Sequence, residues 1–426
     1  MSFFHTNLPV ENVVTPTTAE LRGSMILGIA AQVRKLQSTG REVCNLTVGD
    51  FRPNFFPIPQ EIAEEVQKAY RNGQTNYPPA DGVPELKEAI STLYKNELGL
   101  DYGVEGVCVA SGARPPLFAT WMLFVSKGDK TISFLPAWNN GYYAHMFGAD
   151  HRFIPTTAEN NFHPVREQIE PYLSEVKLIA INSPLNPTGT VISEEALRGI
   201  CEAIVEENDK RIAHGKSPVV LQFDQVYWML REKGVPHVSP AQLVPEIAPY
   251  VVHIDAISKS FAATGLRVGW SVTPAYLQGK MKAVIGHMGA WAARPEQLAT
   301  AWFLNHPEKM HAFLKDMQAR VSERLQLLYQ GVMEMKSRGL PVDAIQPQGA
   351  IYMSFHVNLI GKGQFQTNEE IRHWLLDKAA VAVVPFQAFD MKEDSGWFRM
   401  SVGAANIEDL SSALSRIEKA LSELSY

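Results

Sequence analysis

Seven short apolar runs lie between residues 106 and 273, and they alternate with stretches of helical spacing. The runs are GVCVA, KTISFLP, HRFIPT, VKLIAIN, PVVLQF, YVVHID and RVGWSV. Alternation of buried strands and helices is typical of a mainly parallel sheet covered on both faces. We therefore expect an α/β fold whose larger domain holds a mainly parallel, seven-stranded sheet between helices.

Before this region the pattern is mostly helical. Residues 1–24 are polar and contain prolines and threonines, which indicates an extended arm, and Ser24 is a possible N-cap for a helix over 24–38. Residues 60–72 place apolar side chains on one face and stop before Gly73, as a helix with a C′ glycine should. Residues 81–98 predict a further helix with Pro84 in its opening turn.

After about residue 295 the pattern changes to that of an α+β domain. Helices are expected over 296–305 and 308–338, followed by two strand-like runs, IYMSFHV and VAVVPF, and an amphipathic helix over 407–422. The change of pattern alone sets the predicted boundaries. They are an arm with part of the small domain over 1–52, a large domain over 53–295 and a small domain over 296–426.

The composition narrows the class of protein. The 426 residues are 46% hydrophobic and 20% charged, as in a globular protein, and a net charge of -6 offers no broad basic field. We therefore expect no nucleic-acid or membrane partner. The first residues lack a basic region before a long apolar stretch, and no apolar run approaches the roughly 18 residues of a membrane span. Both observations favour the cytoplasm.

The cysteines and histidines form no pattern typical of cross-links or metal sites. Cys44, Cys108 and Cys201 are scattered and include no CxxC pair, so we interpret them as reduced thiols that pack in the core. The twelve histidines include no HExxH or comparable spacing. No metal site is expected.

Polar residues that could bind ligands or take part in catalysis follow several of the apolar runs, which is where an open α/β sheet binds ligands. GVCVA ends in SGAR, residues 111–114, and a helix starting there would offer backbone N–H groups to a phosphate, although a plain tight turn is the alternative. Asn186 is held in SPLNPTG between two prolines, or simply shapes a turn. Asp224 after PVVLQF needs a cation or caps a helix, and Lys259 after YVVHID faces the same cleft unless it is solvated.

Together these segments resemble the class I/II aminotransferases, which are fold type I pyridoxal-phosphate enzymes, and in particular the bacterial aspartate aminotransferase branch. The resemblance covers nearly the whole chain. Its motifs run in family order: LTVGDF, NYPPADGVPELKEAI, SGAR, PAW, NSPLNPTG, DQVYW, SKSFAATGLRVG and FRMSVG.

The resemblance implies a role in binding pyridoxal 5′-phosphate for residues far apart in the chain. Lys259 would carry the cofactor as a Schiff base, and Asp224 would keep its ring nitrogen protonated. Tyr227 and Asn186 would bind its phenolic oxygen, and Trp138 would stack on its ring unless it is only a core aromatic. Further contacts, mainly to the phosphate, would come from Gly112, Ala113, Arg114, Ser258 and Arg267.

The resemblance also implies how substrate and a second subunit would bind. Arg399 would take the substrate α-carboxylate as a two-pronged fork, and its alternative is a surface salt bridge. Gly49 would let backbone approach the same carboxylate, or only form a turn. Trp138 and Asn186 would also contact substrate. Tyr77 would reach the phosphate of the neighbouring subunit, which implies a homodimer with shared sites.

Two positions depart from the family's pattern. Ala256 stands where many members have Ser or Gly, so a side-chain ligand of the phosphate is missing, for which Ser258 would compensate. Arg114 stands where the bacterial aspartate branch has a lysine, and in that branch the lysine is associated with the distal carboxylate of an acidic substrate. An arginine there would bind that carboxylate, contact the phosphate or fill a helix-start position.

The function that these residues favour is transamination between an L-amino acid and a 2-oxo acid. An acidic substrate such as aspartate is favoured, while the segments PAWNNGYY and GHMGAWAARP also permit an aromatic or neutral one. A pyridoxal-phosphate-dependent lyase or synthase of the same fold is the main alternative. A non-enzymatic cofactor-binding regulator is a weaker one, because only a short, non-basic arm precedes the catalytic body.

Overall fold

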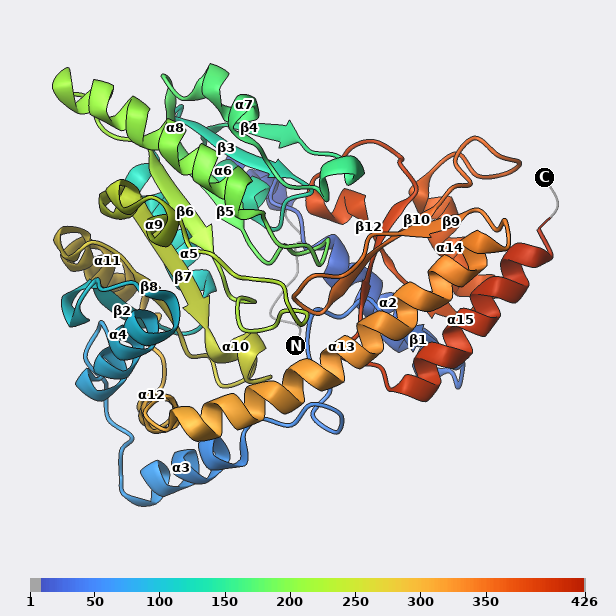
Figure 1. Cartoon of the computed structure of the whole chain (residues 1–426), viewed down its shortest axis with the longest axis horizontal. Coiled ribbons are helices and arrows are strands. Elements are labelled where there is room, and N and C mark those ends of the chain that lie inside the picture. The colour runs from blue at the N-terminus through green and yellow to red at the C-terminus, as the bar shows by residue number, and fades with distance from the viewer. Residues whose placement is uncertain (1–8, 425–426) are drawn as a thin grey trace.

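The computed structural model describes residues 9–424 and consists of two layered parts that share one long helix. Figure 1 shows α13, Pro307–Ser337, running from beneath the larger part to the smaller one. Met310 and Leu314 of α13 pack in the core of the larger part, whereas Met317 and Val321 pack in the core of the smaller one. The predicted domain boundaries after residues 52 and 295 stay predictions.

The larger part contains a seven-stranded sheet in the order β2-β8-β7-β6-β5-β3-β4. Among the described strands of this sheet, β8 alone runs in the direction opposite to the other six. The predicted mainly parallel α/β fold is therefore confirmed. The strands are β2 Val107–Ala110, β3 Lys130–Leu135, β4 Asp150–Pro155, β5 Val176–Asn182, β6 Val220–Asp224, β7 Val251–Ala256 and β8 Gly269–Val272.

Helices cover both faces of this sheet, because alternate strand residues are apolar on each face. In β6, Val220 packs with α5 and α11 on one face, while Leu221 and Phe223 pack with α4, α8 and α12 on the other. The helices of this part are α3 Gln60–Arg71, α4 Pro84–Leu98, α5 Arg114–Phe124, α6 Asn140–Phe147, α7 Arg166–Ile169, α8 Glu194–Ala213, α9 Pro240–Leu243, α10 Ile257–Ser260, α11 Ala275–Met288 and α12 Arg294–Leu304.

The smaller part packs α13, α14 and α15 around a four-stranded antiparallel sheet, and a separate two-stranded parallel pair, β1-β11, lies beside them. The single strand predicted over VAVVPF is wrong. Val381 pairs with Cys44 in one sheet and Val384 pairs with Arg399 in the other, so the buried Val383 separates two strands. These elements are β1 Cys44–Asn45, β9 Val342–Ala344, β10 Tyr352–Val357, β11 Val381–Ala382, β12 Val384–Pro385, β13 Trp397–Ser401, α14 Asn368–Lys378 and α15 Ile407–Ser422.

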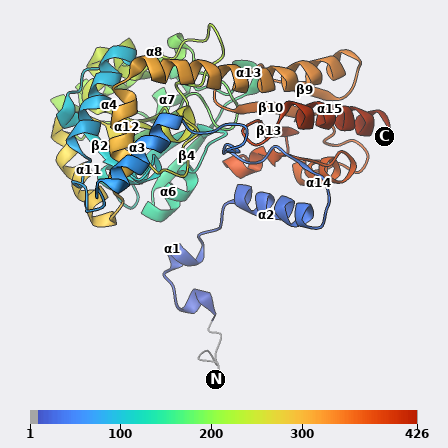
Figure 2. The ribbon, with the colours of Figure 1, turned by 90° about the horizontal axis from the view of Figure 1, so that it is seen from below.

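The N-terminal arm projects away from the body, as Figure 2 shows. It contains the helical turn α1, Pro16–Ala19, in which Thr15 accepts a hydrogen bond from the Thr18 N–H at 3.3 Å, so an entirely extended arm was a wrong expectation. Residues 1–8 lie outside the described residues. Ser24 precedes α2, Met25–Ser38, but makes no side-chain cap bond.

Backbone conformation moves the start of α4 to Pro84, three residues after the predicted start. Gly82 has φ +105° and Val83 is extended, so the helix begins only where the proline ring fixes a helical φ. Short 3₁₀ helices complete the structure: η1 Val10–Asn12, η2 Val104–Gly106, η3 Ala158–Asn160, η4 Glu170–Tyr172, η5 Pro245–Tyr250 and η6 Phe386–Phe389.

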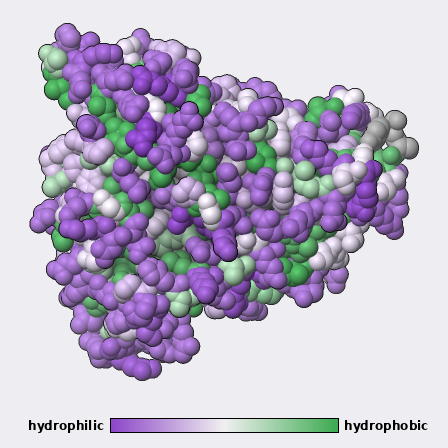
Figure 3. Space-filling view, viewed as in Figure 1, coloured by the Kyte–Doolittle hydropathy of each residue, from purple (hydrophilic) through white to green (hydrophobic). Residues whose placement is uncertain are grey.

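Hydrophilic residues occupy most of the face seen in Figure 3, with hydrophobic residues in small groups between them. No helix within residues 9–424 is long and apolar enough to cross a membrane. The three cysteines are buried and unpaired by disulfides, and burial raises the pKa of each thiol, as expected for packing residues.

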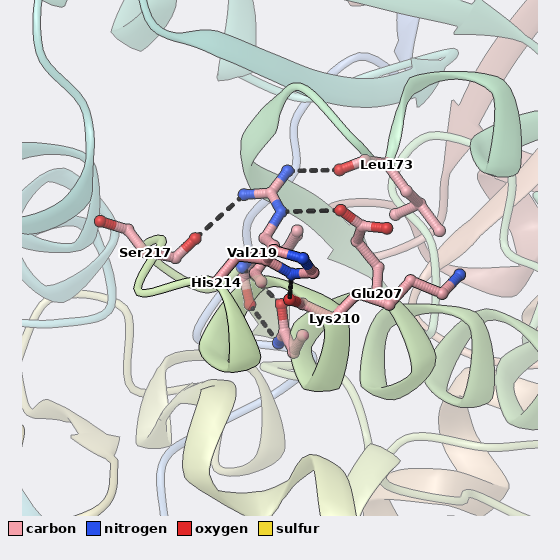
Figure 4. Close-up of polar contacts among 8 residues, drawn as sticks. Leu173, Glu207, Lys210, His214, Ser217 and Val219 are labelled. Atoms are coloured by element: carbon pink, nitrogen blue, oxygen red, sulfur yellow. Dashed lines mark hydrogen bonds and ion pairs between the residues drawn. The ribbon is translucent and has the colours of Figure 1, made fainter.

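A buried polar cluster joins the end of α8 to the start of β6. The Asn208 amide donates to the Val219 carbonyl at 3.0 Å and accepts from the Val219 N–H at 2.7 Å. Arg211 donates to Glu207 and to the carbonyl oxygens of Ser217 and Leu173 (Figure 4). These contacts fix where β6 begins.

Replacing Asn208 with leucine is expected to destabilise the protein by about 2 to 4 kcal/mol. Two buried backbone groups of Val219 lose their partners, and each unpaired group costs roughly 1–3 kcal/mol. Urea unfolding measures the change. The matched control is Asp209→Leu on the exposed side of the same helix, which should stay within about 0.5 kcal/mol of wild type. Equal stability of the two variants would contradict the prediction.

Candidate active site

A cavity of about 320 Å³ lies at the carboxyl ends of β5 and β6, between the two parts of the molecule. It collects residues that are far apart in the sequence. All the predicted site residues except Gly112 and Tyr77 line it, namely Gly49, Ala113, Arg114, Trp138, Asn186, Asp224, Tyr227, Ser258, Lys259, Arg267 and Arg399.

Asp224 is a buried carboxylate at the last position of β6. Its Oδ1 accepts a hydrogen bond from the Val226 N–H at 3.2 Å, and burial raises the pKa of Asp224 to about 7. The segment after β6 is a turn, so the alternative of a helix N-cap is wrong. A carboxylate with such an elevated pKa gains most from a cation placed beside it in the cavity.

Asp224→Asn is expected to stabilise the ligand-free protein in a pH-dependent way. The carboxyl titrates near about 3.9 when unfolded and near 7 when folded, so its burial lowers stability progressively as pH rises between these values and fully above them. Thermal unfolding of both ligand-free proteins should therefore give a higher Tm for the variant at pH 8 and equal Tm values near pH 4. Equal Tm values at pH 8 would show that the carboxylate is well solvated.

Lys259 lies on α10, directly after β7, with its amine inside the cavity. The Nζ donates to the Gly49 carbonyl at 2.6 Å. Burial lowers the pKa of Lys259 to about 8, with the Arg399 and Arg267 guanidinium groups acting in the same direction and Asp50 and Asp224 opposing them. A substantial fraction of this amine is therefore neutral near physiological pH, as a nucleophile or base requires.

The loop after β2 forms the end of the cavity that suits an anion. Gly112 has φ +85°, and α5 begins at Arg114, whose N–H group and that of Ala113 have no backbone partner among the described residues; Pro115 and Pro116, which follow, have no N–H group. Arg267 crosses this loop and donates to the Ser111 carbonyl at 3.1 Å. A Cβ at Gly269 would lie 2.4 Å from the Gly112 carbonyl carbon, so only glycine permits this approach. Gly112 itself supports the loop and does not line the cavity.

Arg399 and Asn186 meet in the wall of the cavity. Arg399 extends from β13, is 1% exposed, and donates to Asn186 Oδ1 at 2.9 Å and to the Thr47 carbonyl at 2.6 Å. Its Nε has no partner among the described residues. The surface-salt-bridge alternative for Arg399 is therefore wrong, and so is a purely local turn role for the Asn186 side chain.

Arg114 and Trp138 lie against each other on the cavity wall. The guanidinium carbon of Arg114 is 4.8 Å from the centroid of the Trp138 ring. Such a contact orients an arginine while leaving its N–H groups available.

Tyr77 lies in a different place from the other predicted residues. It is 82% exposed, packs edge-on against Trp291 at 5.3 Å, and lines a surface hollow with Arg294. The structure therefore does not bring Tyr77 to the cavity of its own chain.

Sequence reasoning missed several residues that also line the cavity. Asp50 accepts a hydrogen bond from Thr264 Oγ at 2.6 Å, and Tyr352 reaches in from β10. Ser24, Ile26 and Leu27 enter from the start of α2. Asp50 could have been predicted to line the cavity because it is adjacent to Gly49. Tyr352 could not, because a tyrosine in an apolar strand reads as a core residue. No group of three or more His, Cys, Asp or Glu side chains suited to a metal occurs in the part of the chain that the structure describes.

Known proteins share this sequence pattern. The model of the family "Aminotransferase class I and II" matches residues 41–417. The chain belongs to the class I and II aminotransferases. This aminotransferase is 30% identical to the aspartate aminotransferase of Rhizobium meliloti (strain 1021), and the alignment covers 94% of each chain.

Solved structures agree with this assignment. This aminotransferase superposes on the structure of aspartate aminotransferase from Thermus thermophilus with maleate. The TM-score is 0.86 and the sequence identity is 26%, over 96% of this chain and 99% of that one. The aromatic aminotransferase from Pyrococcus horikoshii OT3 gives 0.80, at 26% identity over 92% and 99%. The predicted family and activity are confirmed: the protein is an enzyme, a transaminase. The lyase, synthase and regulator alternatives are correspondingly disfavoured.

Proposed function

We propose that this aminotransferase binds pyridoxal 5′-phosphate through Lys259 and moves an amino group between an acidic L-amino acid and a 2-oxo acid. The observation that carries the proposal is that one cavity contains a half-buried amine, a buried acid and a loop with free backbone N–H groups suited to an anion. These three groups match the aldehyde, the ring nitrogen and the phosphate of the cofactor. The family and its aspartate aminotransferase members support it.

The residues fit this cofactor chemically. Asp224, whose pKa is raised to about 7, gains a cationic partner in a protonated ring nitrogen. The Ala113 and Arg114 N–H groups, Ser258 and Arg267 would hold the phosphate. Tyr227 and the amide nitrogen of Asn186 remain to donate to the phenolic oxygen, since Asn186 Oδ1 already accepts from Arg399. Trp138 offers a flat face for the ring.

Each polar group has a role in the exchange of amino groups. The bound cofactor supplies an electron sink for the pair left when the substrate Cα loses its proton. Arg399 would bind the α-carboxylate with the guanidinium N–H groups that its bonds to Asn186 and Thr47 leave free, and would so fix the Cα–H bond. The Lys259 amine, with its pKa near 8, takes up the Cα proton and returns it. Asp224 keeps the ring nitrogen protonated throughout.

An acidic substrate is favoured because Arg114 presents a second cation in the cavity, oriented by Trp138. The Thermus thermophilus structure carries maleate, a dicarboxylate, which supports this choice. The Pyrococcus horikoshii neighbour is named as an aromatic aminotransferase, so an aromatic substrate is the second candidate.

Arg114→Ala is expected to raise KM for aspartate and glutamate by about 10- to 100-fold, because a charge-assisted hydrogen bond contributes roughly 1.5–3 kcal/mol. KM for phenylalanine should change less than about 3-fold. Steady-state kinetics with 2-oxoglutarate or oxaloacetate as acceptor measures both. An equal increase for acidic and aromatic substrates would remove the argument for an acidic substrate.

A product assay separates transamination from lyase chemistry. Enzyme, amino acid and 2-oxoglutarate should yield one glutamate for each new oxo acid. Elimination products without glutamate would contradict the proposal.

The proposed enzyme is a cytoplasmic homodimer whose sites are completed by Tyr77 of the neighbouring subunit. Tyr77 is exposed beside Trp291 in a surface hollow, where it is available to a second copy. Gel filtration with light scattering tests the dimer, and a monomer at micromolar concentration would contradict it.

A further inference from the structure

Tyr352 contacts two of the proposed functional residues of the cavity, Tyr227 and Arg399, although no motif singles it out. It is the first residue of β10, in the smaller part of the molecule, and is 1% exposed. Its backbone lies against the NPTG segment, since a Cβ at Gly189 would lie 1.9 Å from the Tyr352 carbonyl oxygen. The side chain is thereby fixed from both parts of the molecule.

The hydroxyl of Tyr352 contacts the hydroxyl of Tyr227 at 2.6 Å. The two rings meet edge to face with centroids 5.5 Å apart, and this packing holds the two hydroxyl groups next to each other. Burial raises the pKa of both tyrosines, so both hydroxyls keep their protons. Glycine at position 49 makes room for this pair, because a Cβ there would lie 2.7 Å from Tyr352 Oη.

The ring of Tyr352 supports Arg399. The guanidinium carbon lies 4.5 Å from the ring centroid, and register pairs Ser354 of the same strand with Arg399 of β13. Cation–π contact of this kind orients a buried arginine without occupying its N–H groups. One side chain therefore touches both Tyr227 and Arg399.

We propose that Tyr352 is a positioning residue that donates a hydrogen bond to Tyr227 through its hydroxyl and orients Arg399 through its ring. The inference rests on the proposed function, in which the hydroxyl of Tyr227 donates its one hydrogen bond to the phenolic oxygen of pyridoxal phosphate. Tyr227 must then accept from Tyr352. Donation by Tyr352 strengthens the bond that Tyr227 makes, because hydrogen bonds in a chain polarise one another.

The two roles separate in two variants. Tyr352→Phe removes only the hydroxyl, so the bond from Tyr227 weakens and the phenolic oxygen retains its proton to higher pH. The absorbance of the bound cofactor, titrated against pH, should shift its midpoint upward by about 0.3 to 0.5 pH units, since cooperative strengthening is ~10–30% of a bond to a charged group. KM for aspartate should stay within about 2-fold, because the ring over Arg399 remains.

Tyr352→Leu removes the ring as well. It should show the same absorbance shift together with a KM for aspartate raised about 10-fold, as loss of a buried cation–π contact predicts. A KM that rises equally in the Phe variant would overturn the assignment to the ring. Tyr94→Phe is the matched control, because it removes a buried tyrosine hydroxyl that accepts from Gln225 and Trp270 away from the cavity. It should leave midpoint and KM unchanged, and an equal midpoint shift in this control would overturn the inference.

Tyr227→Phe distinguishes this inference from the proposed function. It should raise the midpoint more than Tyr352→Phe does, and the double variant should add nothing further. If Tyr227→Phe shifts the midpoint and Tyr352→Phe does not, the role of Tyr352 fails and the proposed function stands. If neither shifts it, the role of Tyr227 fails and the inference fails with it. An undiminished shift from Tyr352→Phe in the Tyr227→Phe background would also overturn it.

Discussion

Lys259→Ala is expected to reduce turnover by about 10⁴-fold or more. The substitution removes both the amine that joins the cofactor and the base that moves the Cα proton, and general acid–base catalysis alone contributes roughly 10²–10⁴-fold. Single-turnover mixing with aspartate, followed by the absorbance of the cofactor, measures the loss. Lys259, whose half-buried amine has a pKa lowered to about 8, is the only lysine that lines the cavity in the described part of the chain.

Chemical trapping makes the Lys259 assignment specific. Borohydride reduction of the wild-type enzyme with its cofactor, followed by peptide mass spectrometry, should label Lys259. The alanine variant should show no such label, and Lys280→Ala, on the exposed side of α11, should behave as wild type. A reduced adduct on a different lysine in wild type would refute the assignment.

Arg399→Lys is expected to lower kcat/KM for amino acids by about 10²-fold. A lysine keeps the charge but cannot supply two parallel N–H donors, and one charge-assisted hydrogen bond contributes roughly 1.5–3 kcal/mol. The variant also disturbs the contacts to Asn186 and Thr47 that hold the native guanidinium. Steady-state kinetics with aspartate gives the loss.

The loss at Arg399 should depend on the substrate's α-carboxylate. A primary amine that lacks this group should react slowly and equally with wild type and variant. Arg372→Lys provides the control for loss of a buried arginine, since Arg372 is 2% exposed on α14 and pairs with Glu369. A comparable loss of kcat/KM in that control would assign the effect to folding and contradict the binding role.

The sequence pattern predicted the large sheet because strands buried on both faces read as continuous apolar runs. It failed at residues 381–386, where the run is equally apolar but is shared between two sheets, because β11 pairs with β1, which lies far away in the chain, and β12 pairs with β13. Such pairings depend on tertiary contacts that local hydrophobicity does not encode. The helix over 407–422 was predicted to the residue, because its apolar stripe and its Asn406 cap are local.

The candidate site was predictable to the extent that its residues lie in motifs. Asp224 ends an apolar strand, Asn186 and Lys259 follow two others, and parallel strands bring their carboxyl ends together. Tyr352 was not predictable, since in a strand-like run it reads as a core aromatic. Its importance arises from β10 lying beside β13, which only the fold reveals.

The amide clamp between Asn208 and Val219 has a consequence for catalysis as well as for stability. Side chains of a strand alternate between faces, so a slip of β6 by one residue would turn Asp224 away and present Phe223 in its place. The clamp holds Val219, directly before the first residue of that strand, whereas Asp224 is the last residue of the same strand. Partial loss of these two hydrogen bonds would thus yield a folded protein in which Phe223 takes the place of Asp224. Such a protein would bind the coenzyme weakly before it lost any helix.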